Sequence, residues 1–177
     1  MSAPESNPSL PATAAPHPKA NIIKAPLPLP SPLQTPSIFL SGFISPADDC
    51  WRDTLSEELS HSSVTIINPL RRDWDSTWKA SLTDSKFVNQ VTWELNALEQ
   101  ADIVVVNLGV NTEASISLME LGFVAGRGKA IVVCCADEYK NSGNVRVFCE
   151  KLGITVVKTL KDLISSTEQA LERFTSV

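Results

Sequence analysis

The stretch that decides the fold is residues 101–129, ADIVVVNLGVNTEASISLMELGFVAGRGK. Its first part, residues 103–106, is a short Val-rich apolar run, which is typical of a buried strand in a parallel sheet. A polar loop follows, and the run LMELGFVA then predicts a helix that ends near Gly126 and Gly128. Strand, loop and helix in this order are the repeating unit of an α/β fold.

The helix of this unit carries a carboxylate, Glu120, close to its start. The loops at the carboxyl ends of the strands form the ligand crevice of an open parallel sheet, so Glu120 is predicted to face a site. Ser117 and Glu120 also spell a capping box, S-x-x-E. In that alternative the glutamate only accepts a hydrogen bond from the backbone N–H of Ser117. The spacing leaves both interpretations open.

Strands and helices alternate on both sides of this unit. Strands are predicted at residues 37–42, 64–68, 103–106, 129–135 and 153–158, and helices begin near residues 46, 84, 117, 144 and 160. This alternation predicts an α/β three-layer sandwich with a five-stranded parallel sheet, and the right-handed crossover rule favours the flavodoxin-like order 2-1-3-4-5. In that order the loops after the first three strands meet at one crevice. In the helix from residue 84, the predicted buried stripe is Phe87, Val91, Leu95 and Leu98, with Glu94 beside it.

Residues 1–36 differ from the rest in composition, because ten of the twelve prolines lie there. We expect these residues to form a disordered leader and residues 37–177 to form the folded domain. The segment PLPLPSP favours polyproline II geometry, which leaves two possibilities, a ligand for an SH3-type module or a solvated leader.

Composition excludes several classes of function. No stretch approaches the roughly 18 apolar residues of a membrane span, and no signal peptide precedes the domain, so we expect a soluble, cytoplasmic protein. The net charge of −5 argues against a nucleic-acid polymer as partner, but not against a single nucleotide. The four cysteines form no C-x-x-C pair and lie apart from the two histidines, so we expect reduced thiols, no metal site and no cofactor.

Two loops offer candidate binding residues. The first strand ends in Ser41, Gly42 and Phe43, where small residues let a ligand approach the backbone, although the dinucleotide fingerprint G-x-G-x-x-G is absent. The loop after the second strand carries Arg71, Asp73 and Trp74, which could bind an anion in a fork and stack on a base. The alternative is a lid packed by its own tryptophans, with its arginines paired to its aspartates.

Four blocks of this sequence together resemble one enzyme family. They are FLSGFIS (39–45), NPLRRDWD (68–75), FVNQVTWELNALEQADIVVV (87–106) and SISLMELGFVAGRGK (115–129). Over about residues 37–157 the chain is similar to the nucleoside 2-deoxyribosyltransferase family, in particular to its "nucleoside 2-deoxyribosyltransferase-like" branch. The most specific block runs from Trp93 to Lys129.

The resemblance implies cleavage of an N-glycosidic bond through a covalent (deoxy)ribosyl-enzyme. Glu120 matches the family's nucleophile, and Glu94 matches an acid that assists proton transfer to the base. Asn144 matches a residue that reaches the neighbouring subunit's site, because members are usually oligomers with shared sites. A general acid must be protonated, so we expect the pKa of Glu94 to exceed that of Glu120.

The chain also departs from the family pattern. Ala114, with Glu113 beside it, replaces an aspartate that holds the sugar hydroxyls, whereas Ser115 and Ser117 resemble serines that bind phosphate in related hydrolases of nucleoside 5′-monophosphates. The expected partner is therefore a small nucleoside or nucleotide. Two other functions stay open: a non-catalytic nucleotide-binding module, and a hydrolase of a larger nucleotide such as NAD.

Overall fold

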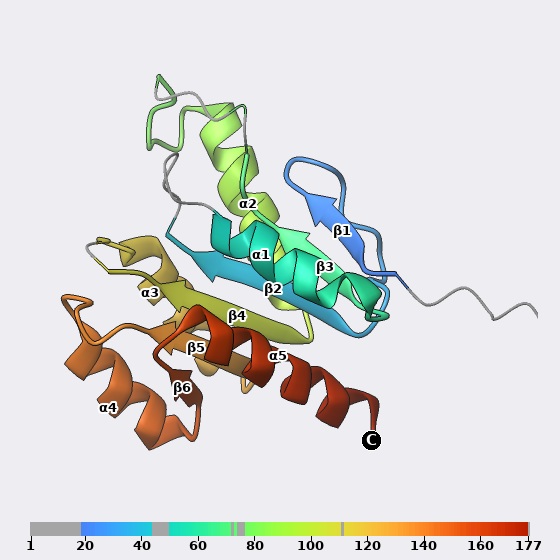
Figure 1. Ribbon diagram of the computed structural model, residues 1–177. Helices are drawn as coiled ribbons and strands as arrows, with labels where there is room; N and C mark the ends of the chain where they lie inside the picture. Colours follow the sequence, from blue (N-terminus) through green and yellow to red (C-terminus); the bar gives the residue numbers. More distant parts are fainter. Residues whose placement is uncertain (1–18, 44–49, 72, 74–76, 111, 177) are drawn as a thin grey trace, which may run out of the picture.

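The computed structural model describes residues 19–43, 50–71, 73, 77–110 and 112–176, and helices and strands alternate along them (Figure 1). The strands are β1 (Asn21–Lys24), β2 (Ser37–Gly42), β3 (Thr65–Asn68), β4 (Ile103–Leu108), β5 (Ala130–Cys135) and β6 (Thr155–Val157). The helices are α1 (Cys50–Glu58), the 3-10 helix η1 (Leu59–His61), α2 (Ser85–Gln100), α3 (Ser115–Ala125), α4 (Ser142–Leu152) and α5 (Leu160–Thr175). Each strand from β2 onward corresponds to a predicted one.

The described strands form one sheet of six in the order β1-β3-β2-β4-β5-β6, and every pairing is parallel. The five predicted strands, β2 to β6, have the predicted order, with the second strand outside the first and the third to fifth on the other side. The predicted count of five was wrong, because β1 pairs with the outer edge of β3.

The boundary predicted at residue 36 was therefore also wrong. Residues 21–24 pair in register with residues 65–68, and Ile23 is buried in the core. Leu33 is buried after it, and the indole Nε1 of Trp93 donates to the Leu27 carbonyl at 2.8 Å. Proline lacks a backbone N–H, so a proline-rich segment can cross the sheet with few unpaired donors. The part of the predicted leader before residue 19 lies outside the described residues.

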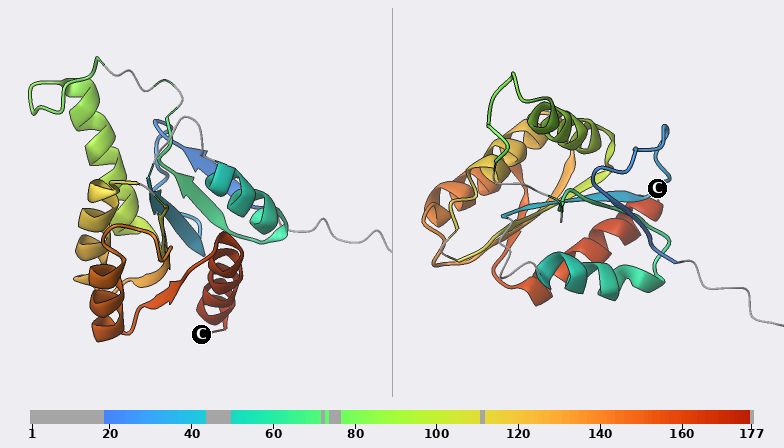
Figure 2. Two further views of the ribbon diagram at one scale, coloured as in Figure 1. Left: turned by 60° about the vertical axis from the view of Figure 1, so that its left-hand side comes forward. Right: turned by 90° about the horizontal axis from the view of Figure 1, so that it is seen from above.

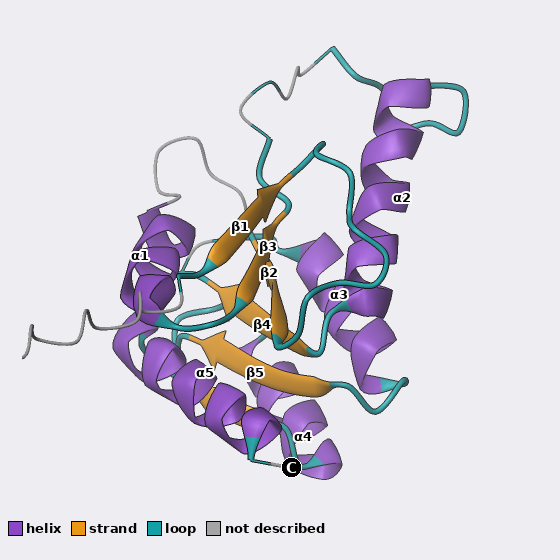
Figure 3. Ribbon diagram, turned by 90° about the vertical axis from the view of Figure 1, so that its right-hand side faces the viewer, coloured by secondary structure: helices purple, strands orange, loops and turns teal. Residues whose placement is uncertain are grey.

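Two helical layers cover the sheet, as the view along its edge shows (Figure 3). Helices α1 and α5 lie on one face, and α2, α3 and α4 lie on the other, which the view from above also shows (Figure 2). Alternate strand residues serve the two layers: Phe39 belongs to the core with Leu98 and Val124, whereas Ile38 and Leu40 belong to the core with Leu55. Among the described residues, none of the helices has the length and apolar character that crossing a lipid bilayer requires.

Helix α2 buries only part of the predicted stripe. Its buried side chains are Gln90, Ala97 and Leu98, whereas Phe87 and Val91 are half-buried and Leu95 is exposed. Asp84 caps the helix by accepting hydrogen bonds from the backbone N–H groups of Lys86 and Phe87 at 3.0 and 3.2 Å. The correction matters for the site, because Gln90 and Glu94 share the inward face of α2.

Candidate active site

Glu120 points away from its own helix end and contacts strand β2. Helix α3 begins at Ser115, after Ala114 in the left-handed region (φ 41°, ψ 30°), and Ala114 provides no side-chain cap. Glu120 consequently lies in the second turn of α3, whereas the sequence predicted it in the first turn. Its carboxylate accepts a hydrogen bond from Ser41 Oγ at 2.6 Å, and the residue is 8% exposed. The capping-box alternative is therefore wrong.

Ser41 reaches Glu120 because of its position on β2. It shares the side of Phe39, which faces the layer of α2, α3 and α4, and it lies at the carboxyl end of the strand. Gly42 comes next, where a Cβ atom would lie 2.7 Å from the Asn107 carbonyl oxygen and 2.9 Å from Trp51 Cζ2. The lack of a side chain at Gly42 therefore allows Asn107 and Trp51 to pack closely against it. The role predicted for Gly42 was to let a ligand approach the backbone. Phe43 is exposed.

Glu94 provides a second carboxyl group from α2. Its Oε1 accepts a hydrogen bond from Gln90 Nε2 at 2.8 Å, and the same nitrogen donates to the Pro69 carbonyl at 3.2 Å. Gln90 thus ties Glu94 to the loop after β3. The charge of Glu94 acts directly on Glu120, since it contributes to the raised pKa of Glu120. The structure therefore brings Ser41, Glu94 and Glu120 together at one edge of the sheet.

Both carboxyl groups favour the protonated form. Burial raises the pKa of Glu120 to about 7, with Ser41 opposing that change, Glu94 adding to it and the positive charge of Arg52 lowering it. Burial also raises the pKa of Glu94, against the hydrogen bond from Gln90 and the charge of Arg52. Because the two groups are coupled, the order of their pKa values stays a prediction.

Sequence analysis missed Arg52, which is fully buried on α1 beside this pair. Its position carried a signal, because Arg52 shares a helix face with Leu55 and Leu59, three and seven residues along. Gln90 was missed for a similar reason. It precedes Glu94, Ala97 and Leu98 by four, seven and eight residues, which is the period of the buried face.

The loop after β3 is engaged in contacts of its own. Arg71 donates from Nε and Nη2 to both carboxylate oxygens of Asp73, and its guanidinium lies 4.8 Å from the centre of the Trp78 ring. Arg71 Nη1 also donates to Gln90 Oε1 at 3.5 Å. This arrangement favours the self-packed lid over an open anion fork. Trp74 lies outside the described residues.

The remaining predicted residues differ in their surroundings. Ser117 is buried on α3, whereas Ser115 is exposed at its first position. Glu113 is exposed, and its Oε1 lies 3.9 Å from Lys140 Nζ. Asn144 lies exposed on α4. Cys134, Cys135 and Cys149 are buried free thiols, and no group of three or more potential metal ligands occurs within the described part of the chain.

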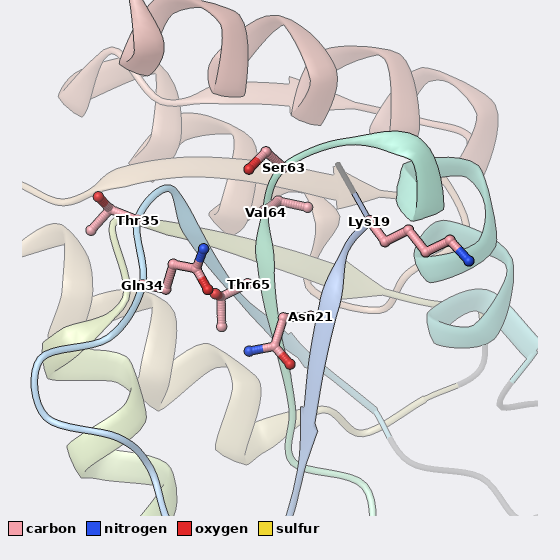
Figure 4. A pocket seen from close by; sticks show the side chains of 7 residues that line it. All are labelled: Lys19, Asn21, Gln34, Thr35, Ser63, Val64 and Thr65. Carbon is pink, nitrogen blue, oxygen red and sulfur yellow. The ribbon is translucent and has the colours of Figure 1, made fainter. Parts of the chain in front are cut away.

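Two cavities lie at opposite ends of the strands, one at the amino-terminal edge of the sheet and one at the carboxyl edge. The one at the amino-terminal edge has a volume of about 10 Å³, the room of one water molecule (Figure 4). It is lined by Lys19, Asn21, Gln34, Thr35, Ser63, Val64 and Thr65. The cavity at the carboxyl edge measures about 270 Å³, near the lower limit of small-molecule sites. It is lined by Lys24, Ala25, Asp53, Asn68, Leu70 and Asp73.

Comparison with known proteins identifies the family. The family model described as "nucleoside 2-deoxyribosyltransferase like" matches residues 35–139. The chain belongs to this family. The matched range contains Ser41, Glu94 and Glu120, whereas β1 and Asn144 lie outside it.

The fold has a counterpart among solved structures. The crystal structure of a conserved protein from Enterococcus faecalis V583 superposes with a TM-score of 0.55 at 19% sequence identity. The alignment covers 76% of this chain and 98% of the bacterial one. At this identity the likeness concerns the fold alone. No curated protein sequence matches this chain significantly.

Proposed function

We propose that this protein cleaves the N-glycosidic bond of nucleosides or nucleoside 5′-monophosphates, with Glu120 as nucleophile, and passes the (deoxy)ribosyl group to water or to a second base. The observation that carries this proposal is the placement of Glu120. Its carboxylate is held by Ser41 at the carboxyl edge of the sheet, beside a second acid, instead of capping its own helix. Buried acids that interact in this way are typical of catalytic sites.

The reaction divides into two displacements. An oxygen of Glu120 attacks the anomeric carbon, the bond from that carbon to the base nitrogen breaks, and its electron pair leaves with the base. Glu94 delivers a proton to the departing base, which makes the base a better leaving group. Water or a second base then attacks the same carbon and releases Glu120. Glu94, now ionised, takes the proton of an attacking water.

The two acids together set the protonation state of the site. The nucleophile must be ionised while the acid is protonated, so the working form of the pair holds one proton. Burial of both groups and the charge of Glu94, which raises the pKa of Glu120, favour such a form near neutral pH. We therefore expect base release to have a bell-shaped pH dependence whose alkaline limb lies near the raised pKa of about 7.

The substrate is expected to be held by its phosphate more than by its sugar hydroxyls. Ala114 offers no side-chain acceptor, and Glu113 lies exposed beside Lys140. Ser115 and Ser117 lie in the first turn of α3, where backbone N–H groups and the helix dipole favour an anion. Nucleoside 5′-monophosphates are therefore the preferred substrates within the proposal.

The proposal includes a homo-oligomer with shared sites. Helices α3 and α4, which lie on the same face of the sheet, carry exposed apolar side chains, namely Ile116 and Met119 on α3 and Val147 and Phe148 on α4. Such side chains are typical of contact surfaces, and Asn144 precedes Val147 by one helical turn. Within the proposal, Asn144 is the residue that reaches the neighbouring subunit's site.

One assay tests the function directly. The purified protein is incubated with nucleosides, deoxynucleosides and their 5′-monophosphates, and free base is followed by chromatography. We expect release from at least one monophosphate and none with Glu120→Gln. Binding of a nucleotide without any release would favour the second candidate, a non-catalytic nucleotide-binding module, which the loss of the sugar-binding carboxylate at Ala114 also favours.

A further inference from the structure

Arg52 is a buried cation at the end of strand β2. Its side chain is 0% exposed, although α1 begins only two residues before it. Nη2 donates to the Gly42 carbonyl at 2.8 Å, Nη1 to the Phe43 carbonyl at 3.3 Å, and Nε to the Leu40 carbonyl at 3.4 Å. The guanidinium therefore holds the chain on both sides of Ser41.

The surroundings of Arg52 leave this part of the chain little freedom. The guanidinium carbon lies 4.5 Å from the centre of the Trp51 ring, and the same ring packs on Gly42. Burying a guanidinium costs hydration energy, and an apolar side chain of similar volume would avoid that cost. The helix nevertheless places its cation here, beside the strand end that carries Ser41.

The same cation acts on both carboxyl groups of the site. Its positive charge lowers the pKa of Glu120 and of Glu94, against the burial that raises both. The charged groups that act on Glu120 are Glu94 on α2 and Arg52 on α1, and Arg52 also acts on Glu94. Arg52 thus favours the ionised form that a nucleophilic carboxylate needs.

We propose that Arg52 is a positioning residue of this site, which fixes the backbone around Ser41 and thereby the hydroxyl that holds Glu120, and which places a permanent positive charge behind the two acids. Its effect on turnover rests on the proposed function. Its effect on the titration of the two carboxyl groups does not, so the two can fail separately.

The test is a titration of side-chain carboxyl groups by ¹³C NMR in the full-length protein, with Glu120 and Glu94 assigned from their Gln variants. Arg52→Met removes the charge, and we expect the pKa of Glu120 to rise above its parental value of about 7. Arg52→Gln, which keeps hydrogen-bond donors, takes its place if the Met variant does not fold, and the same rise is expected. An unchanged titration in the folded variant overturns the electrostatic half of the proposal.

Arg52→Lys separates charge from geometry. It keeps the positive charge but loses the fork that reaches three carbonyl oxygens, so we expect the pKa of Glu120 to stay near that of the parent. Base release should fall about tenfold, mainly in kcat, because Ser41 is held less firmly. Parental kcat and KM in this variant would overturn the positioning half.

The chain offers a matched control in Arg146. Its Nη2 donates to the Cys135 carbonyl at 3.2 Å, at the carboxyl end of β5, so it holds a strand end in a similar way. Arg146→Met should leave the titration of Glu120 unchanged. A shift as large as in Arg52→Met would show a general effect of loosening the sheet and would overturn the proposal.

Discussion

Two groups of charged side chains lie at the same edge of the sheet and are built in opposite ways. The Glu94–Glu120 pair is buried, like-charged and restrained by neutral donors, Gln90 and Ser41. The Arg71–Asp73 pair is opposite in charge and Asp73 is exposed. The hydrogen bonds from Arg71 lower the pKa of Asp73. Burying two acids together destabilises the folded state, whereas the Arg71–Asp73 ion pair joins opposite charges. Ionisable groups that are buried at such a cost are typical of reactive sites.

The largest effect is expected from Glu120→Gln, which removes the nucleophile but keeps the acceptor for Ser41. Base release should fall by about 10³-fold or more, because no other group can form the covalent intermediate. Asp73→Asn serves as the control on the other pair. Substantial base release by Glu120→Gln would show that the contrast between the two pairs does not mark the chemistry.

Glu94→Gln should slow base release by about 10²–10⁴-fold for bases that need protonation. It should also change the shape of the pH profile, because the alkaline limb near the raised pKa of about 7 depends on the last proton of the pair. The variant is expected to lose the alkaline limb, so that base release rises with pH to a plateau. The midpoint of this rise should lie below pH 7, because removing the charge of Glu94 lowers the pKa of Glu120. A bell-shaped profile identical to the parent's would exclude Glu94 as the acid.

Stability should depend on pH in a way that Glu120→Gln removes. The pKa of Glu120 is raised from 4.5 to about 7, so the folded state binds a proton that the unfolded chain releases between these values. The free energy of unfolding of the parent therefore falls as pH rises through this range, by up to about 3 kcal/mol from this group. Urea denaturation of parent and variant measures it.

Above pH 7 the Gln variant should be the more stable protein. The exposed residue Glu113 provides the matched control, since Glu113→Gln should leave the pH dependence as it is. A Gln variant that is less stable than the parent at every pH would indicate a structural role for the carboxylate, as in a helix cap.

Ser41→Ala should have a smaller effect. It removes the hydrogen bond that lowers the pKa of Glu120, so the alkaline limb of the pH profile, which lies near this pKa, should move to higher pH. Base release at the optimum should fall by up to about tenfold, because the net contribution of one hydrogen bond is about 1 kcal/mol. Steady-state kinetics across pH measure the position of the limb and the rate at the optimum. The control is Ser115→Ala at an exposed position, which should affect substrate binding through phosphate but not the pKa of Glu120.

The smallest effect is expected from Asp73→Asn on the exposed pair. Its ion pair with Arg71 is screened by water, so Tm and kcat should stay close to the parental values. Thermal unfolding and the base-release assay check this. A loss of activity comparable to that of Glu94→Gln would mean that the Arg71–Gln90 contact transmits more to Glu94 than its length of 3.5 Å suggests.

The sequence predicted what depends on strong local patterns. Runs such as AIVVCC gave strands β2 to β6, and the crossover rule gave their order. Strand β1 was missed because NIIK is too short to stand out among prolines, and it exists only through its pairing with β3. The same limit applies to the predicted boundary at residue 36.

The sequence predicted those residues of the candidate site that lie in recognisable motifs. Glu120 came from its place after the third predicted strand and from the family resemblance. Glu94 came from the resemblance alone, and Ser41 came from the end of the first strand. Arg52 and Gln90 were missed because polar residues on a buried helix face look like interruptions of the apolar stripe. The strongly raised pKa of Glu120 was also missed, since burial depth depends on the packing of three elements that are far apart in sequence.

The most direct test of this account is the pKa of Glu120 in the free parent protein, measured by ¹³C NMR of its side-chain carboxyl group. We expect a midpoint of about 7 and a second inflection that disappears in Glu94→Gln, because the two acids are buried together. A single midpoint near the ordinary value of 4.5, unchanged in that variant, would contradict the existence of a buried, coupled pair.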